Sequence, residues 1–175
     1  MSDLEFYKSI YDRELARRLD LDNALNIPIG IIAILIAVLS YIANNLNTCS
    51  RSIIQIIIIT FTIVSAVLIF ISIFYLARSY NNLLKGHNYR NLALTEEVRK
   101  YQTDLLSYNL KLTNEEKKVD FESRLIEKLN HYTDNHILIN DFRQISLYYA
   151  KSLIIGASFL TLLSLILIAT NKYIL

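Results

Sequence analysis

The chain has 175 residues, of which 53% are hydrophobic and 19% charged, and its formal net charge is +2. Charged residues are missing from three stretches: 28 consecutive residues between Asp22 and Arg51, 26 between Arg51 and Arg78, and 20 between Lys151 and Lys172. A helix that crosses a hydrocarbon layer about 30 Å thick needs about 20 apolar residues, so these stretches predict membrane spans and argue against a water-soluble globular domain.

The composition also argues against several enzyme classes. The three glycines, Gly30, Gly86 and Gly156, are isolated, whereas a phosphate-binding loop needs clustered glycines. The single cysteine, Cys49, forms neither a disulfide within the chain nor a paired-cysteine zinc site. The small, dispersed net charge does not suggest nucleic-acid binding. We therefore expect no catalytic, cofactor-binding or metal-binding residues and no enzymatic activity.

Residues 1–23 are predicted to form an amphipathic helix, which begins with a capping box between Ser2 and Glu5. One side of this helix carries the apolar residues Leu4, Tyr7, Tyr11, Leu15 and Leu19. Two roles fit this pattern. The helix lies on a membrane surface through its arginines, or it packs against the cytoplasmic helices.

Residues 24–77 are predicted to form a transmembrane hairpin with spans at about 24–43 and 53–76. Pro28 falls in the first turn of the first span, where its missing N–H is tolerated. The loop between the spans is short, so the second span returns antiparallel to the first. Residues 152–175 contain the third span and a short outer tail.

Residues 78–151, between the second and third spans, are predicted to form a cytoplasmic helical stalk, because they contain no proline and one glycine. From Tyr80 to Leu112 the pattern predicts one helix that continues the second span. Its residues at alternating steps of three and four form a narrow seam for packing against another copy. The seam consists of His87, Asn91, Leu94, Val98, Tyr101, Leu105, Tyr108 and Leu112.

A second capping box, from Thr113 to Glu116, predicts the start of a returning helix. We expect an interruption at Asp134 and Asn135, followed by an apolar series that leads into the third span: Leu138, Phe142, Ile145 and Tyr149. The predicted fold is an all-α integral membrane protein with three transmembrane helices and a long cytoplasmic helical hairpin between spans two and three.

The distribution of basic residues predicts the orientation. Sixteen of the 18 lysines and arginines lie in residues 1–23 and 78–151, and basic residues favour the cytoplasmic side. The N-terminus is therefore expected inside and the C-terminus outside, which places Cys49 outside. Cys49 is then either a free thiol or a partner in a disulfide with a neighbouring copy.

Each span carries a stripe of small or hydroxyl-bearing residues, and none carries a charge or a histidine, which argues against an ion-coupled transporter. Because lipid gives helices no hydrophobic drive to associate, such stripes mediate close packing. They serve either packing within one chain or a pore or subunit interface in an oligomer. The candidate residues are Gln55, Thr62, Ser65, Ser72, Thr161 and Ser164.

The charged helix Asp12-Arg13-Glu14-Leu15-Ala16-Arg17-Arg18-Leu19, the two-span hairpin and the amphipathic stretch after Arg78 together resemble the SLATT-type small membrane effectors of bacterial antiviral and nucleotide-signalling defence. The resemblance covers roughly residues 1–112. It implies a self-associating inner-membrane protein that permeabilises or depolarises the bilayer when a cytoplasmic protein or a nucleotide signal acts on it.

Two functions are consistent with the sequence. The first is a non-enzymatic, oligomeric membrane effector of the abortive-infection type, whose cytoplasmic part senses a signal or partner and whose spans permeabilise the membrane. The second is a membrane anchor or assembly subunit that recruits a soluble partner through the stalk.

Overall fold

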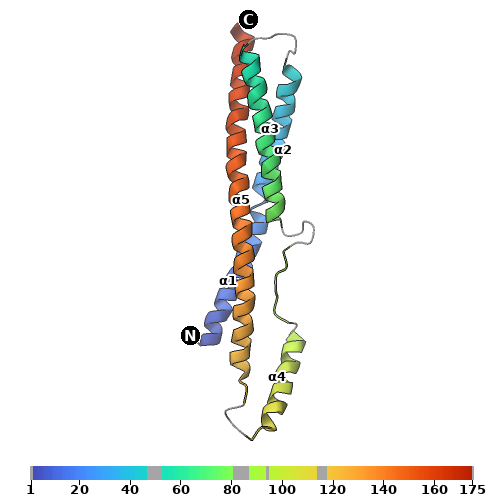
Figure 1. Cartoon of the computed structure of the whole chain (residues 1–175), viewed down its shortest axis with the longest axis vertical. Coiled ribbons are helices and arrows are strands. Elements are labelled where there is room, and N and C mark those ends of the chain that lie inside the picture. The colour runs from blue at the N-terminus through green and yellow to red at the C-terminus, as the bar shows by residue number, and fades with distance from the viewer. Residues whose placement is uncertain (1, 47–52, 81–86, 94, 114–117, 175) are drawn as a thin grey trace. The chain divides into compact units, whose positions relative to one another are not determined.

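The computed structural model describes residues 2–46, 53–80, 87–93, 95–113 and 118–174, and every regular element among them is a helix (Figure 1). The helices are α1 (Asp3–Asn23), α2 (Asn26–Asn45), α3 (Ile53–Ser79), α4 (Thr95–Leu110) and α5 (Phe121–Ile174). Three helical stretches are long and apolar enough to cross a membrane, and they lie within Asp3–Asn45, Ile53–Ser79 and Phe121–Thr170. The helical fold class and three candidate spans are thereby confirmed.

The chain divides into two compact units, each built from two separate segments. The polar unit consists of Met1–Asp20 and His87–Asp141, and the apolar unit consists of Leu21–Gly86 and Phe142–Leu175. Helices α1 and α5 contribute residues to both units, whereas α2 and α3 belong to the apolar unit and α4 to the polar unit.

In the apolar unit, α2, α3 and the C-terminal half of α5 lie side by side (Figure 1). Their shared core consists of Leu21, Leu25, Ile32, Leu35, Ile69, Leu76, Leu147, Ala150, Ile154 and Ala157. Many larger apolar side chains point outward instead, and Phe70 is 75% exposed. A water-soluble unit rarely exposes so many large apolar side chains, so the surface of this unit suits a hydrocarbon environment.

In the polar unit, α1 packs against α5 through Tyr11 and Glu14, which are both buried. The predicted capping box is confirmed, because the Ser2 amide donates to the Glu5 carboxylate at 3.0 Å and the Glu5 amide donates to the Ser2 hydroxyl at 3.3 Å. The buried contacts of α1 therefore correspond to the packing role that the sequence left open.

Helices α4 and α5 form a hairpin that Asn109 closes. Its side chain donates to the Val119 carbonyl at 2.8 Å and accepts from the Val119 amide at 3.1 Å. Helix α5 begins at Phe121, later than the predicted start, with the Asp120 carboxylate as its cap. Glu116, the second half of the predicted capping box, lies outside the described residues.

The predicted continuous helix from Tyr80 to Leu112 is wrong. Helix α3 ends at Ser79, and residues 87–93 are not helical. Tertiary contacts explain the difference, because polar side chains of α5 bind the backbone of Arg90 and compete with helical hydrogen bonds there. The predicted interruption at Asp134 and Asn135 is also wrong, since α5 runs through both residues and Asn135 accepts from the Arg90 amide instead.

Candidate functional site: the buried polar stripe of α5

Apart from Ser146, the buried side chains of α5 repeat in alternating steps of four and three residues, and many of them are polar. We call this set the α5 stripe. In the polar unit it comprises Leu129, Thr133, His136 and Asn140. In the apolar unit it comprises Arg143, Leu147, Ala150, Ile154, Ala157, Thr161 and Ser164. An average spacing of 3.5 residues keeps all these positions on one face of a helix packed against its neighbours.

Three serines of α3 hydrogen-bond to the backbone of the stripe. The hydroxyl groups of Ser65, Ser72 and Ser79 each donate at 3.0 Å to a backbone carbonyl of α5. The acceptors are the carbonyls of Ala157, Ala150 and Arg143, respectively. The serines follow one another every seven residues toward the C-terminus of α3, and their acceptors follow one another every seven residues toward the N-terminus of α5. The two helices are therefore antiparallel and in register. Small side chains at these positions let the two backbones approach closely.

Further hydroxyl groups continue this contact. The Ser65 and Thr161 hydroxyls lie 2.7 Å apart, and Thr161 also donates to the Ala157 carbonyl. Ser164 is fully buried and donates to the Leu160 carbonyl of its own helix. Four of the predicted candidates, Ser65, Ser72, Thr161 and Ser164, are therefore buried in the apolar unit. A role for any of them in a pore stays a prediction.

The other two candidates have different surroundings. Gln55 is buried near the start of α3. Thr62 is half-buried, donates to the Ile58 carbonyl at 2.8 Å, and lines a groove of about 420 Å³ between α2 and α3. The small-residue stripe of the first span faces outward, since its members are all exposed: Gly30, Ala33, Ala37, Ser40 and Asn44. Cys49 lies outside the described residues.

Arg143 is a fully buried cation within the apolar unit. Its Nε donates to the Ser79 carbonyl at 2.7 Å, and its Nη2 donates to Oδ1 of Asp22. Ser79 is the last residue of α3, where helical carbonyls lack partners within the helix and carry partial negative charge. Arg143 therefore supplies both a hydrogen bond and a positive charge at the end of α3, and it links α3 to the end of α1.

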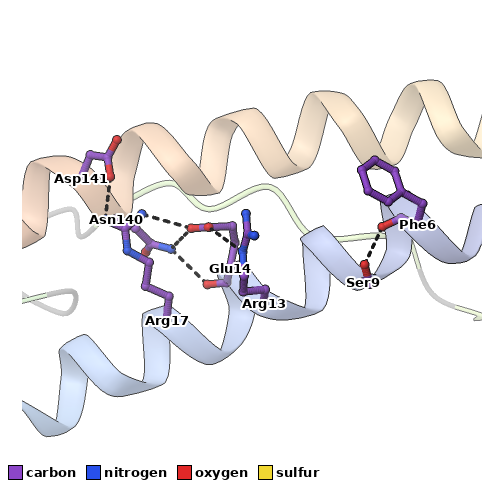
Figure 2. Close-up of polar contacts among 7 residues, drawn as sticks. All are labelled: Phe6, Ser9, Arg13, Glu14, Arg17, Asn140 and Asp141. Atoms are coloured by element: carbon purple, nitrogen blue, oxygen red, sulfur yellow. Dashed lines mark hydrogen bonds and ion pairs between the residues drawn. The ribbon is translucent and has the colours of Figure 1, made fainter.

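In the polar unit, a second group of charged side chains surrounds the buried carboxylate of Glu14 (Figure 2). Asn140 donates to this carboxylate at 3.1 Å and to the Glu14 carbonyl at 3.0 Å. Arg17 contacts the same carboxylate at 3.4 Å and Asp141 at 2.6 Å. Burial lowers the pKa of the Arg17 guanidinium, but the hydrogen bond and charge of Asp141, together with Glu14, outweigh burial and raise it above its ordinary value.

His136 joins the segment before α4 to the same unit. Its Nε2 lies 2.9 Å from the Arg90 carbonyl, so this nitrogen carries the proton and donates. The rings of Tyr11 and Tyr89 lie 5.4 and 4.9 Å from the imidazole, and the Tyr89 hydroxyl donates to Oδ1 of Asn140 at 2.8 Å. These contacts hold residues 89 and 90 against α1 and α5.

The residues of the predicted oligomer seam are not gathered on one helix. His87 and Asn91 lie in the non-helical segment, Leu94 is outside the described residues, and Leu112 follows α4. The members on α4 are Val98, Tyr101, Leu105 and Tyr108. No residue of α4 is buried. Two hollows of about 210 and 480 Å³ separate α4 from α5, and both are lined by Tyr101, Arg124, Lys128 and Tyr132.

The sequence did not identify four of the buried residues with large polar side chains: Glu14, His136, Asn140 and Arg143. Each was a polar residue in a stretch predicted to face the cytoplasm, so nothing in the local pattern marked it as buried. The alternating steps of four and three from His136 to Arg143 were a usable signal. The apolar series from Leu138, with the same steps, concealed it.

Within the ranges that the structure describes, no three His, Cys, Asp or Glu side chains are grouped closely enough to hold a metal ion. Comparison of the chain with protein-family models, curated proteins and solved structures found no match. The function is therefore inferred from the chain's own geometry.

Proposed function

We propose that this chain is a multi-pass protein of the cell inner membrane, with its N-terminus inside and its C-terminus outside, and that it acts as a non-enzymatic membrane effector. The polar unit receives a signal or a partner, either a cytoplasmic protein or a nucleotide, and the apolar unit responds by permeabilising the bilayer. The spans meet the length and composition that insertion requires, and the outward apolar side chains suit lipid.

The observation that carries the proposal is the α5 stripe. Helix α5 supplies buried residues to both units, so a signal that binds to the polar unit acts on the same helix that packs against α3. That packing relies on small side chains and hydroxyl groups rather than large apolar ones. Water can replace these hydrogen bonds, so separating α3 from α5 in an oligomer exposes a polar surface within the membrane.

The second candidate, a membrane anchor or assembly subunit, has an observation of its own in its favour. Ser65, Ser72, Thr161 and Ser164 all have acceptors within the same chain. Hydroxyl groups that are hydrogen-bonded within the chain stabilise the three-helix unit, and this role does not require a pore. The polar unit, in which α4 has no buried residue and leaves hollows beside α5, then serves to bind a soluble partner.

Induced expression in bacteria with a potential-sensitive dye separates the two candidates. The effector depolarises the membrane, and Ser65→Ala combined with Thr161→Val abolishes this effect, because the two hydroxyls bond each other between α3 and α5. Thr60→Val is the matched control, since Thr60 is an exposed residue of α3 whose hydroxyl bonds only the Ile56 carbonyl. A membrane that stays polarised at high expression, with a soluble protein that co-purifies through the polar unit, refutes the effector and supports the anchor.

A further inference from the structure

Arg90, in the non-helical segment 87–93 that precedes α4, is bound by two histidines of α5. His136 donates from Nε2 to the Arg90 backbone carbonyl at 2.9 Å. Nε2 of His131 forms a hydrogen bond with Nη1 of the Arg90 guanidinium. All three residues belong to the polar unit. The chain that leads into α4 is therefore fastened to α5 through two imidazole rings.

The hydrogen bond of His131 requires a neutral imidazole. A guanidinium is always charged in proteins and has donors but no acceptor, so Nε2 of His131 must accept. A protonated imidazole carries an N–H group on both nitrogens and cannot accept. Its charge also repels the Arg90 guanidinium. Protonation of His131 therefore breaks this contact.

His136 is neutral in this arrangement for a different reason. Its side chain is fully buried, and Nδ1 has no hydrogen-bond partner among the residues that the structure describes. Because Nε2 carries the proton that is donated to the Arg90 carbonyl, Nδ1 has none. A second proton on Nδ1 places a charge and an unsatisfied donor inside the polar unit, and both cost free energy. Water satisfies this donor once the ring is exposed.

The other ionisable groups around the two rings do not offset this cost. Around His136 they are Tyr11, Glu14, Arg18, Tyr89 and Arg90. Around His131 they are Arg90, Tyr101, Arg124, Glu127, Lys128, Tyr132 and Asp134. The carboxylates of Glu14 and Glu127 are paired with Arg17 and Arg124. Asp134 is exposed, so water and salt screen its charge.

We propose that His131 and His136 form an acid-sensitive clasp, which holds segment 87–93 against α5 at neutral pH and releases it in acid. Histidine ordinarily changes its charge between about pH 5 and 8. The released state binds more protons than the clasped state, so a falling pH favours release. The two remaining contacts, from the Arg90 amide to Asn135 and from the Tyr89 hydroxyl to Asn140, do not titrate in this range.

For the proposed effector, acidification of the cytoplasm is then a signal that the polar unit receives. This regulatory role rests on the proposed function, whereas the clasp itself depends only on contacts within the polar unit. The experiment therefore measures the clasp directly and does not use membrane depolarisation as its readout.

Hydrogen exchange of the full-length protein in detergent micelles tests the clasp. The Arg90 amide donates to Oδ1 of Asn135 at 2.9 Å while the segment is bound. Its protection factor, relative to an unstructured peptide at the same pH, therefore reports release. One bound proton shifts such an equilibrium by at most about tenfold per pH unit. From about pH 7.5 to about pH 5.5 the protection factor should fall about tenfold, while amides in the middle of α5 stay protected.

Glutamine variants separate the hydrogen bonds from the titration. In His136→Gln the amide nitrogen can still donate to the Arg90 carbonyl, and in His131→Gln the amide oxygen can still accept from the guanidinium. Neither glutamine titrates, so the double variant should give a flat pH profile and each single variant a reduced fall. His87→Gln is the matched control, because His87 lies in the same segment with its ring 6.4 Å from that of Tyr89. It should keep the full fall.

Several results overturn the clasp. These are a flat profile in the unmodified protein, an undiminished fall in the double variant, and a loss of protection along α5 that parallels the loss at Arg90. If glutamine at the buried position 136 unfolds the polar unit, His131→Gln alone decides, and an unchanged fall in that variant refutes the clasp. A protein that keeps the clasp but never depolarises a membrane refutes the proposed function alone.

Discussion

Removing either partner of the ion pair between Asp22 and Arg143 should destabilise the apolar unit by different amounts. The Arg143 side chain is fully buried, whereas the Asp22 side chain is 39% exposed. Asp22→Ala leaves a buried guanidinium without its carboxylate, which costs about 3 kcal/mol. Arg143→Met keeps the aliphatic stem and leaves a carboxylate that water reaches and a buried Ser79 carbonyl without its donor, which costs about 2 kcal/mol.

The double variant is the decisive measurement. It contains no isolated buried charge, so its cost should stay near that of Arg143→Met alone, about 2 kcal/mol, which gives a coupling energy of about 3 kcal/mol between the two positions. The free energy of unfolding is measured by titrating dodecyl sulfate into protein in mild detergent micelles and following the loss of helical circular dichroism.

Asp20→Ala is the control for this series, since Asp20 is an exposed carboxylate two residues away on the same helix. It should change the free energy of unfolding by less than about 0.5 kcal/mol. If the costs of Asp22→Ala and Arg143→Met simply add in the double variant, the two side chains do not interact. The view that Arg143 links the end of α1 to the end of α3 is then refuted.

Three further predictions concern other parts of the chain. Ser72→Ala should lower the free energy of unfolding by about 1 kcal/mol in the same assay, because it removes the hydrogen bond to the Ala150 carbonyl. Ser72→Leu should lower it by about 3 kcal/mol or more, because a large side chain pushes α3 away from Ala150. Equal costs for the two variants contradict the close approach of α3 and α5. The amide and hydroxyl of Ser123 donate hydrogen bonds to the Asp120 carboxylate and lower its pKa. The cap of α5 is therefore present at neutral pH, and it is lost in acid as the pH falls through this lowered pKa. The protection factor of the amides in the first turn of α5, which compares their exchange with that of an unstructured peptide at the same pH, should therefore fall in acid. Asp120→Ala should remove this dependence, and an unchanged profile in that variant contradicts the role of the cap. Cys49 should react with a membrane-impermeant maleimide in intact cells, and labelling only after lysis contradicts the proposed orientation.

Hydrophobic patterning predicts the helices of this chain well where the surrounding medium is uniform. In α2, α3 and the C-terminal half of α5, long uncharged runs leave only a helix to satisfy the backbone in an apolar environment, so the candidate spans follow directly from the sequence. The same reasoning fails between Thr133 and Tyr149. The apolar series that begins at Leu138 was the regular feature of this stretch, whereas the structure buries the polar face that contains His136 and Arg143.

The failure has a physical cause. Burial of His136, Asn140 and Arg143 depends on the Arg90 carbonyl, the Glu14 carboxylate and the Ser79 carbonyl, respectively. These partners lie far away in the sequence, and a burial rule based on local hydrophobicity does not include them. Burial of a polar group costs free energy unless the group is hydrogen-bonded, so the positions of these side chains depend on the helices that supply their partners.

The end of the second span shows the same division. From the sequence, the regular spacing after Tyr80 predicts that the helix continues, because this stretch contains no proline to end it. In the structure α3 ends at Ser79, whose carbonyl accepts a hydrogen bond from Arg143. The next described segment binds α5 through the backbone of Arg90.

The sequence by itself therefore determined the helical class and the three candidate spans, because these depend on local length, charge and hydrophobicity. Only the tertiary structure decided which face of each helix is buried, where the second span ends and which polar groups meet. Those outcomes depend on hydrogen bonds between residues far apart in the chain, and such bonds exist only once the helices are packed together.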